Sequence, residues 1–99
     1  MARLITFNRR STVQLQKILT FYDKRNGSDV YSRRLLKNLM EDLERLALMP
    51  TASSPSTRDN VRFFYLMGFI IIFRYDSHRL TVLSIRSTAR QPLKVYQKK

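Results

Sequence analysis

The sequence predicts a single α+β domain spanning residues 1–99, in which a helical hairpin packs on an antiparallel sheet in the order β-α-α-β-β-β. Two patterns predict this fold class. Apolar residues recur every three or four positions through the first half of the chain, and the period shortens to two after residue 60. The apolar fraction of 43% is high enough to fill one core, so a disordered chain is not expected.

The first elements are a strand and a helix. Residues 3–7 favour β-structure and are followed by polar residues, so we expect a strand there. Ser11 or Thr12 is expected to cap a helix, with Gln14 at the capping-box position relative to Ser11. Asn26-Gly27 ends this helix, because both residues tolerate a positive φ. Its apolar face contains Leu15, Ile18, Leu19 and Tyr22.

A second helix is expected over Val30–Leu48, capped by Ser28 or Asp29. Its long apolar stripe spans about five turns. The stripe consists of Tyr31, Leu35, Leu39, Leu43 and Leu46. Because the connection between the helices is short, we expect an antiparallel hairpin. The segment 49–60 is rich in Pro, Ser and Thr and is predicted to be a loop.

Three strands follow, over Val61–Leu66, Phe69–Tyr75 and Leu80–Ile85. Short turns at Met67-Gly68 and at residues 76–78 connect them, which predicts an antiparallel meander. The middle strand is apolar on both faces from Phe69 to Phe73, so we expect it to be central and covered by the helices.

The charge balance indicates a polyanionic partner. The chain has 19 Lys and Arg against seven Asp and Glu, a net charge of +12. Nucleic acid, a ribosome, an anionic membrane or an acidic protein would all match this charge. The acids all lie between Asp23 and Asp76, so we expect an anion to meet the acid-free C-terminal end.

The sequence lacks the residues that several classes of function require. The chain has no Cys, which removes disulfide scaffolds, thiol catalysis and cysteine-ligated metal sites. The single histidine, His78, falls in a predicted turn, and Gly27 and Gly68 are better explained as turn glycines than as a phosphate-binding loop. We therefore expect no metal and no cofactor. The apolar run Phe63–Phe73 is far shorter than the about 20 residues of a membrane helix, and no secretion signal is present, so we expect a cytoplasmic protein without a membrane partner.

The remaining candidates for chemistry are basic residues and a tyrosine around the sheet and its C-terminal end. They are Arg62, Arg74, Arg86, Arg90, Lys94, Tyr96 and Lys98. Strand pairing could bring several of them onto one concave face. Guanidinium groups bind phosphate bidentately, and tyrosine can stack on a base or donate a proton. The alternative interpretation is that these are ordinary surface residues of a very basic protein.

Three segments together resemble the RelE/ParE family. They are the helical-hairpin turn Arg25-Asn26-Gly27-Ser28, the run from Arg62 to Arg74, and the C-terminal pattern from Thr81 to Ile85 followed by Thr88-Ala89-Arg90-Gln91-Pro92. The family consists of small toxins of type II toxin–antitoxin systems, often first described as plasmid stabilisation proteins. The resemblance covers nearly the whole chain and implies a RelE/ParE-like fold and an acidic antitoxin that lays an amphipathic segment on the toxin.

The resemblance implies two alternative activities. The RelE-like branch is a ribosome-dependent, metal-independent endonuclease that cleaves mRNA through its 2′-hydroxyl. On this first expectation Arg62, Arg90 and Tyr96 are catalytic, and Arg74, Arg86, Lys94 and Lys98 bind nucleic acid. The ParE-like branch is the alternative, and it inhibits DNA gyrase without a known catalytic constellation. Ile70 favours this branch, because the nuclease branch has an arginine at that position. An unrelated nucleic-acid-binding role is a third possibility.

Overall fold

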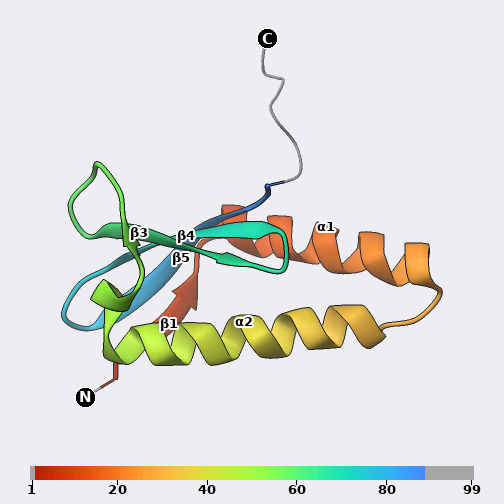
Figure 1. The fold of residues 1–99 in the computed structure, drawn as a ribbon, viewed down its shortest axis with the longest axis horizontal. Coiled ribbons are helices and arrows are strands. Elements are labelled where there is room, and N and C mark those ends of the chain that lie inside the picture. The colour runs from red at the N-terminus through yellow and green to blue at the C-terminus, as the bar shows by residue number, and fades with distance from the viewer. Residues whose placement is uncertain (1, 89–99) are drawn as a thin grey trace, which may run out of the picture.

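The computed structural model describes residues 2–88 and has the predicted order of helices and strands (Figure 1). The elements are β1 (Leu4–Phe7), α1 (Arg9–Asn26), α2 (Val30–Leu48), a 3-10 turn η1 (Pro50–Ala52), β2 (Ser54–Pro55), β3 (Val61–Leu66), β4 (Phe69–Tyr75) and β5 (Arg79–Ser87). η1 and β2 are additions to the prediction, within the segment that was expected to be a loop. The final strand is also longer at both ends than the sequence indicated.

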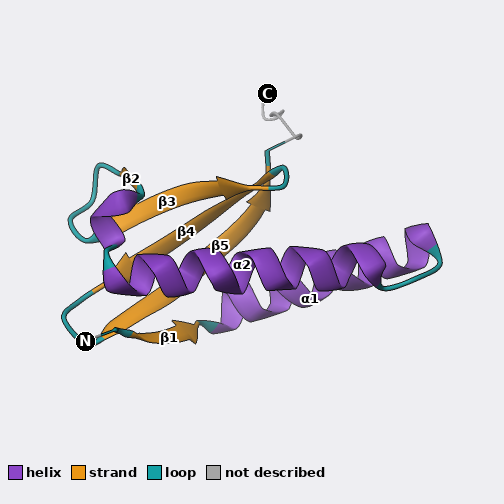
Figure 2. Ribbon diagram, turned by 60° about the horizontal axis from the view of Figure 1, so that its bottom comes forward, coloured by secondary structure: helices purple, strands orange, loops and turns teal. Residues whose placement is uncertain are grey.

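The sheet has five strands in the order β1-β5-β4-β3-β2, and both helices lie on one face of it (Figure 2). β3, β4 and β5 form the predicted antiparallel meander, and β4 is the central strand. β1 pairs in parallel with β5. The helical hairpin brings the chain back to the end of the sheet where β1 began, so β3 runs in the direction of β1, and two antiparallel pairings give β5 the same direction. The prediction that Phe69–Tyr75 is central is therefore confirmed, although the helices cover only one of its faces.

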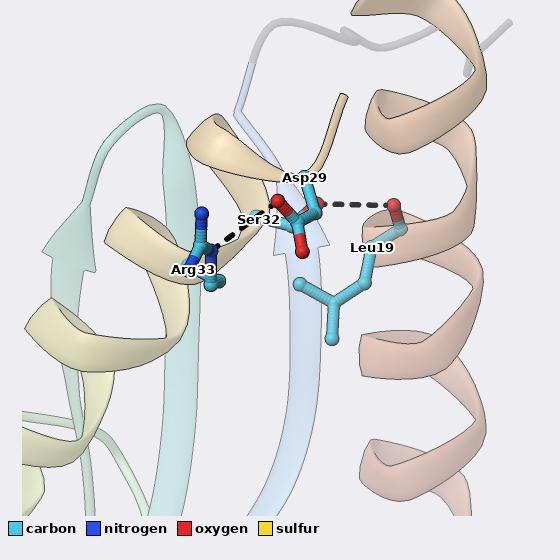
Figure 3. Close-up of polar contacts among 4 residues, drawn as sticks. All are labelled: Leu19, Asp29, Ser32 and Arg33. Carbon is cyan, nitrogen blue, oxygen red and sulfur yellow. Dashed lines mark hydrogen bonds and ion pairs between the residues drawn. The ribbon is translucent and has the colours of Figure 1, made fainter. Parts of the chain in front are cut away.

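The helical hairpin closes as predicted at Gly27, whose φ of 69° is left-handed and whose N–H donates to the carbonyl of Asp23. Ser32 Oγ in α2 donates to the carbonyl of Leu19 in α1 at 3.1 Å and joins the two helices (Figure 3). Asp29 occupies the N-cap position of α2, but its side chain makes no capping hydrogen bond. Its carboxylate instead lies 3.3 Å from the Arg33 guanidinium, one turn along the helix.

The predicted cap of the first helix is wrong. α1 begins two residues before Ser11, and Asn8 is its N-cap, with its side-chain oxygen accepting from the Ser11 N–H at 2.8 Å. Ser11 is fully buried, and its hydroxyl donates to the carbonyl of Val82 in β5 at 2.9 Å. The Ser11 side chain therefore joins the helix to the sheet.

The core lies between α2 and the middle of the sheet. Its buried members are Leu35, Leu39, Leu43 and Leu46 of α2, Phe64 of β3, Phe69, Ile71 and Phe73 of β4, and Leu80, Val82 and Ile85 of β5. The predicted apolar face of α1, Leu15-Ile18-Leu19-Tyr22, packs on this core but is only partly buried. α2 is consequently the main covering helix, and α1 leaves one long side in solvent. In the described part of the chain, neither helix is both long and apolar enough to cross a bilayer.

Candidate functional site on the open face of the sheet

The sheet face turned away from the helices is the candidate site, and we term it the open face. Side chains alternate between the two faces of a strand, and the strand register aligns those of neighbouring strands in rows. The row Tyr65-Ile70-Arg86 lies at one end of the face, and the row Phe63-Ile72-Ser84 comes next. Beyond them lies the row Arg74-Thr81-Thr6.

The centre of the open face is apolar. Ile70, Ile72 and Phe63 are half-buried, and no helix of residues 2–88 packs on them. Phe63 and Tyr65 lie side by side along β3 with ring centroids 5.8 Å apart, in an edge-to-face arrangement. Tyr65 is 64% exposed, so its ring is available to a partner.

Arginines flank this apolar centre. Arg74 and Arg86 both belong to the open face, and the register places them at opposite ends of it, about 13 Å apart along β4. Arg86 Nε donates to Ser84 Oγ at 3.3 Å. Within residues 2–88 the ion pairs are Arg33–Asp29, between α2 and its N-cap, and Arg45–Asp42, within α2. No carboxylate of the described chain therefore forms an ion pair with Arg74 or Arg86, although Asp59 and Asp76 line the same hollow as Arg74.

Arg62 does not join these arginines. It lies opposite Phe73 in the register and shares the helix-facing side of β3 with Phe64. Its guanidinium donates to the Ser53 carbonyl at 2.6 Å, to Ser53 Oγ at 3.1 Å and to the Thr51 carbonyl at 3.3 Å. Through these hydrogen bonds Arg62 holds η1 and the start of β2 against the sheet.

A polar hollow of about 340 Å³ adjoins the third row, where the β4–β5 turn meets the loop before β3. The two backbone N–H groups of His78 and Arg79 donate to the Asp76 carboxylate, both at 2.7 Å, and hold the pKa of Asp76 below its ordinary value. On the helical side, burial raises the pKa of the Tyr31 hydroxyl, helped by the neighbouring Tyr22. Within residues 2–88, no three His, Asp or Glu side chains gather closely enough to hold a metal ion.

The other predicted site residues, Arg90, Lys94, Tyr96 and Lys98, lie outside the described residues. Tyr65 was not among the predicted site residues, although it is the most exposed aromatic ring of the face. The strand pattern places Tyr65 on the opposite side from Phe64, but it does not tell which of the two sides meets the helices. The described face presents aromatic rings and arginines around an apolar centre.

The fold and this face define a class of protein: a small basic α+β domain with an exposed sheet face. The family model described as "ParE toxin of type II toxin-antitoxin system, parDE" matches residues 5–92. The chain therefore belongs to this family, and the resemblance to RelE/ParE toxins is confirmed.

A solved structure has a similar fold. The structure described as the chromosomal ParDE TA system from P. aeruginosa has a TM-score of 0.70 to this chain, over 87% of this chain and 96% of that one, with 19% sequence identity. No curated protein matches the chain at a significant level. The chain is a ParE-type toxin of a type II toxin–antitoxin system, and an antitoxin partner follows from that membership.

Proposed function

We propose that this toxin acts by binding DNA gyrase through the open face, without cutting nucleic acid. The observation that supports this most directly is the apolar centre formed by Phe63, Ile70 and Ile72. Cleavage of a phosphodiester needs cations and proton-transferring groups within about 3 Å of the reacting atoms, and an apolar centre supplies neither. An apolar centre with aromatic side chains and a rim of arginines is typical of a protein–protein interface.

The rim residues have a defined part in this proposal. Arg74 and Arg86 are in no ion pair within the described residues, so they can steer and orient an acidic protein surface. Tyr65 offers a rigid amphipathic ring beside the apolar centre, which is the kind of side chain that contributes most at interfaces. Membership of the ParE family adds support, because gyrase is the target associated with that branch.

The second candidate function is ribosome-dependent cleavage of mRNA. The net charge of +12 and the two guanidinium groups of the open face, neither of which is in an ion pair within the described residues, favour it. Arg90 and Tyr96 would then stabilise the transition state and move a proton, with Lys94 and Lys98 binding the RNA. Arg62 is the weakest member of this set, since its guanidinium already binds Ser53 and Thr51.

Two assays on the same preparation separate the candidates: supercoiling by DNA gyrase and cleavage of mRNA on programmed ribosomes. We expect inhibition of supercoiling and no cleavage by the wild-type chain. We also expect Ile70→Glu to abolish the inhibition, because it places a charge in the apolar centre. The matched control is Leu36→Glu, at a residue of similar size that is 39% exposed on α2.

Circular dichroism must first show that both variants are folded. Cleavage of ribosomal mRNA with undisturbed supercoiling would refute the gyrase proposal and establish the second candidate. Equal loss of inhibition in both variants would show that the open face is not the contact surface. Expression without growth arrest, with folded protein confirmed, would contradict both candidates.

A further inference from the structure

The strand β5 interrupts its alternation once, beside the open face. β4 and β5 pair in one register as far as Val82, and after it the register shifts by one residue, so that Ser84 lies opposite Ile72. Leu83 is the extra residue of this β-bulge. A bulge changes the direction of the side chains that follow it, and bulges are frequent beside functional sites. The residues after Leu83 are therefore of special interest.

The bulge decides which side of the sheet Arg86 occupies. Without the shift, the pairing would place Arg86 opposite Phe69, a core residue that is 5% exposed. The shift instead pairs Arg86 with Ile70, which belongs to the open face. It also turns Ile85 into the core, where this side chain is 4% exposed. One extra residue thus keeps a guanidinium out of the core and adds it to the open face.

Helix α1 holds the backbone of β5 just after the bulge. The pairing of β1 with β5 ends at Val82, so residues 83–87 have no neighbouring strand of the described chain on that side (Figure 2). The Gln14 side chain takes the place of a strand there, because its Oε1 accepts from the Ile85 N–H at 2.7 Å. Ile85 is therefore held between β4 and α1, one residue before Arg86.

Ser84 orients the Arg86 side chain itself. Ser84 is 4% exposed, and its Oγ accepts from Arg86 Nε at 3.3 Å. The two terminal amino groups of this guanidinium make no hydrogen bond or ion pair within residues 2–88. They form a planar fork of donors whose geometry matches a carboxylate. The hydrogen bond to Ser84 uses Nε and leaves this fork available to a partner.

Arg74, the other arginine of the open face, is not held in this way. Its side chain makes no hydrogen bond or ion pair within the described residues, and Asp59 and Asp76 line the same hollow. An arginine side chain that is already ordered loses less conformational entropy when a partner binds. We therefore expect Arg74 to steer a partner and Arg86 to make a specific contact with it.

We infer that Ser84 is a positioning residue, which orients Arg86 to bind a carboxylate of the gyrase surface. The inference rests on the proposed function, and it names the group that Arg86 recognises and the residue that prepares Arg86 for it. Arg86 shares a row with Ile70 and Tyr65, so an apolar group beside the partner's carboxylate would cover Ile70. A DNA phosphate also fits the fork, but the groups beside it on a DNA strand are charged and do not suit an apolar floor.

The test measures inhibition of supercoiling by variants that circular dichroism shows to be folded. Arg86→Ala should raise the concentration for half-inhibition about tenfold or more, because a carboxylate of the partner loses its donors. Arg86→Lys should recover little of this, since an ammonium group has neither the fork nor the Nε that Ser84 holds. Ser84→Ala should raise the concentration about threefold, the size expected for one hydrogen bond. The matched control, Ser32→Ala, also removes a buried hydroxyl with one hydrogen bond, and it should leave inhibition unchanged.

A double variant separates positioning from a general structural effect. If Ser84 acts through Arg86, Ser84→Ala has no further effect in the Arg86→Ala background. The inference is overturned by the same loss in both backgrounds, by unchanged inhibition in Arg86→Ala, or by full recovery in Arg86→Lys. Binding of duplex DNA by the toxin alone, abolished by Arg86→Ala, would assign a phosphate to the fork and overturn the carboxylate.

Nitrogen-15 NMR of the full chain keeps this test apart from that of the target. The Arg86 Nε–H should exchange with water more slowly than the Arg74 Nε–H, and Ser84→Ala should remove the difference. Equal exchange of the two groups in the wild-type chain would refute the positioning role, whatever the target. Slow exchange at Arg86 together with uninhibited gyrase would refute the target and the carboxylate, and would support Ser84 as the residue that holds Arg86.

Discussion

Replacing Arg62 by Ala tests whether this residue holds the fold or belongs to the functional site. The guanidinium makes hydrogen bonds to Ser53 O, Ser53 Oγ and Thr51 O, the first two in a partly buried setting. A hydrogen bond from a charged donor contributes about 1.5 to 3 kcal/mol when buried. Partial exposure lowers this, and the exposed bond to Thr51 adds little, so we expect Arg62→Ala to reduce the free energy of unfolding by about 2 kcal/mol.

Chemical denaturation with urea measures this change. With a slope of about 1 to 3 kcal/mol per molar, a loss of this size moves the midpoint by about 1 M. The matched control is Arg74→Ala on the adjacent strand, because Arg74 is exposed and its side chain makes no hydrogen bond or ion pair within the described residues. The control should stay within about 0.5 kcal/mol of wild type.

The same two variants separate structure from activity. Folded Arg62→Ala should inhibit gyrase as strongly per molecule as wild type, whereas folded Arg74→Ala should inhibit less. Arg62→Lys should recover only part of the stability, because an ammonium group lacks the planar fork that reaches several acceptors. A stability of Arg62→Ala within 0.5 kcal/mol of wild type, or a loss of activity in the fully folded variant, would refute the structural role.

Three further predictions concern the core, the pH dependence and the mechanism. Leu39→Ala should cost about 2 to 5 kcal/mol in urea denaturation, since Leu39 is 1% exposed, and a cost under about 1 kcal/mol would show that the stripe is not core. Backbone hydrogen bonds hold the pKa of Asp76 in the folded chain below the ordinary value of 3.8. The ionised carboxylate therefore stabilises the fold above pH 3.8, and this stabilisation is lost as the pH falls through the lower, folded pKa. Asp76→Asn keeps an acceptor but removes the titration, so its urea midpoint should fall less than that of wild type between pH 5 and 3; equal falls would contradict the assignment. If mRNA is cleaved, Arg90→Ala should slow cleavage about 10²-fold or more and Tyr96→Phe should also slow it, whereas a pure gyrase inhibitor shows no cleavage in any variant.

The helices were predictable because their signals are local. The apolar stripe from Leu35 to Leu46 predicts α2, and Asn26-Gly27 predicts the end of α1 and so the hairpin. Each of these patterns lies within a few helical turns of the element that it predicts. The cap of α1 was not predictable in the same way. Ser11 has the residue type of an N-cap, but its hydroxyl is satisfied by Val82, a strand residue 71 positions away. Only the parallel return of β1 beside β5 creates that partner, and no pattern near Ser11 encodes it.

The face occupied by Arg62 was ambiguous for a related reason. In β3 both alternating sets contain large apolar residues, Phe64 and Leu66 on one side and Phe63 and Tyr65 on the other. Alternation fixes which residues share a face, but it does not decide which face meets the helices. Phe64 is buried against Phe73, so its side of β3 is the one that meets the helices. Arg62 shares that side, and its guanidinium therefore reaches Ser53 and lies on the opposite face from Arg74.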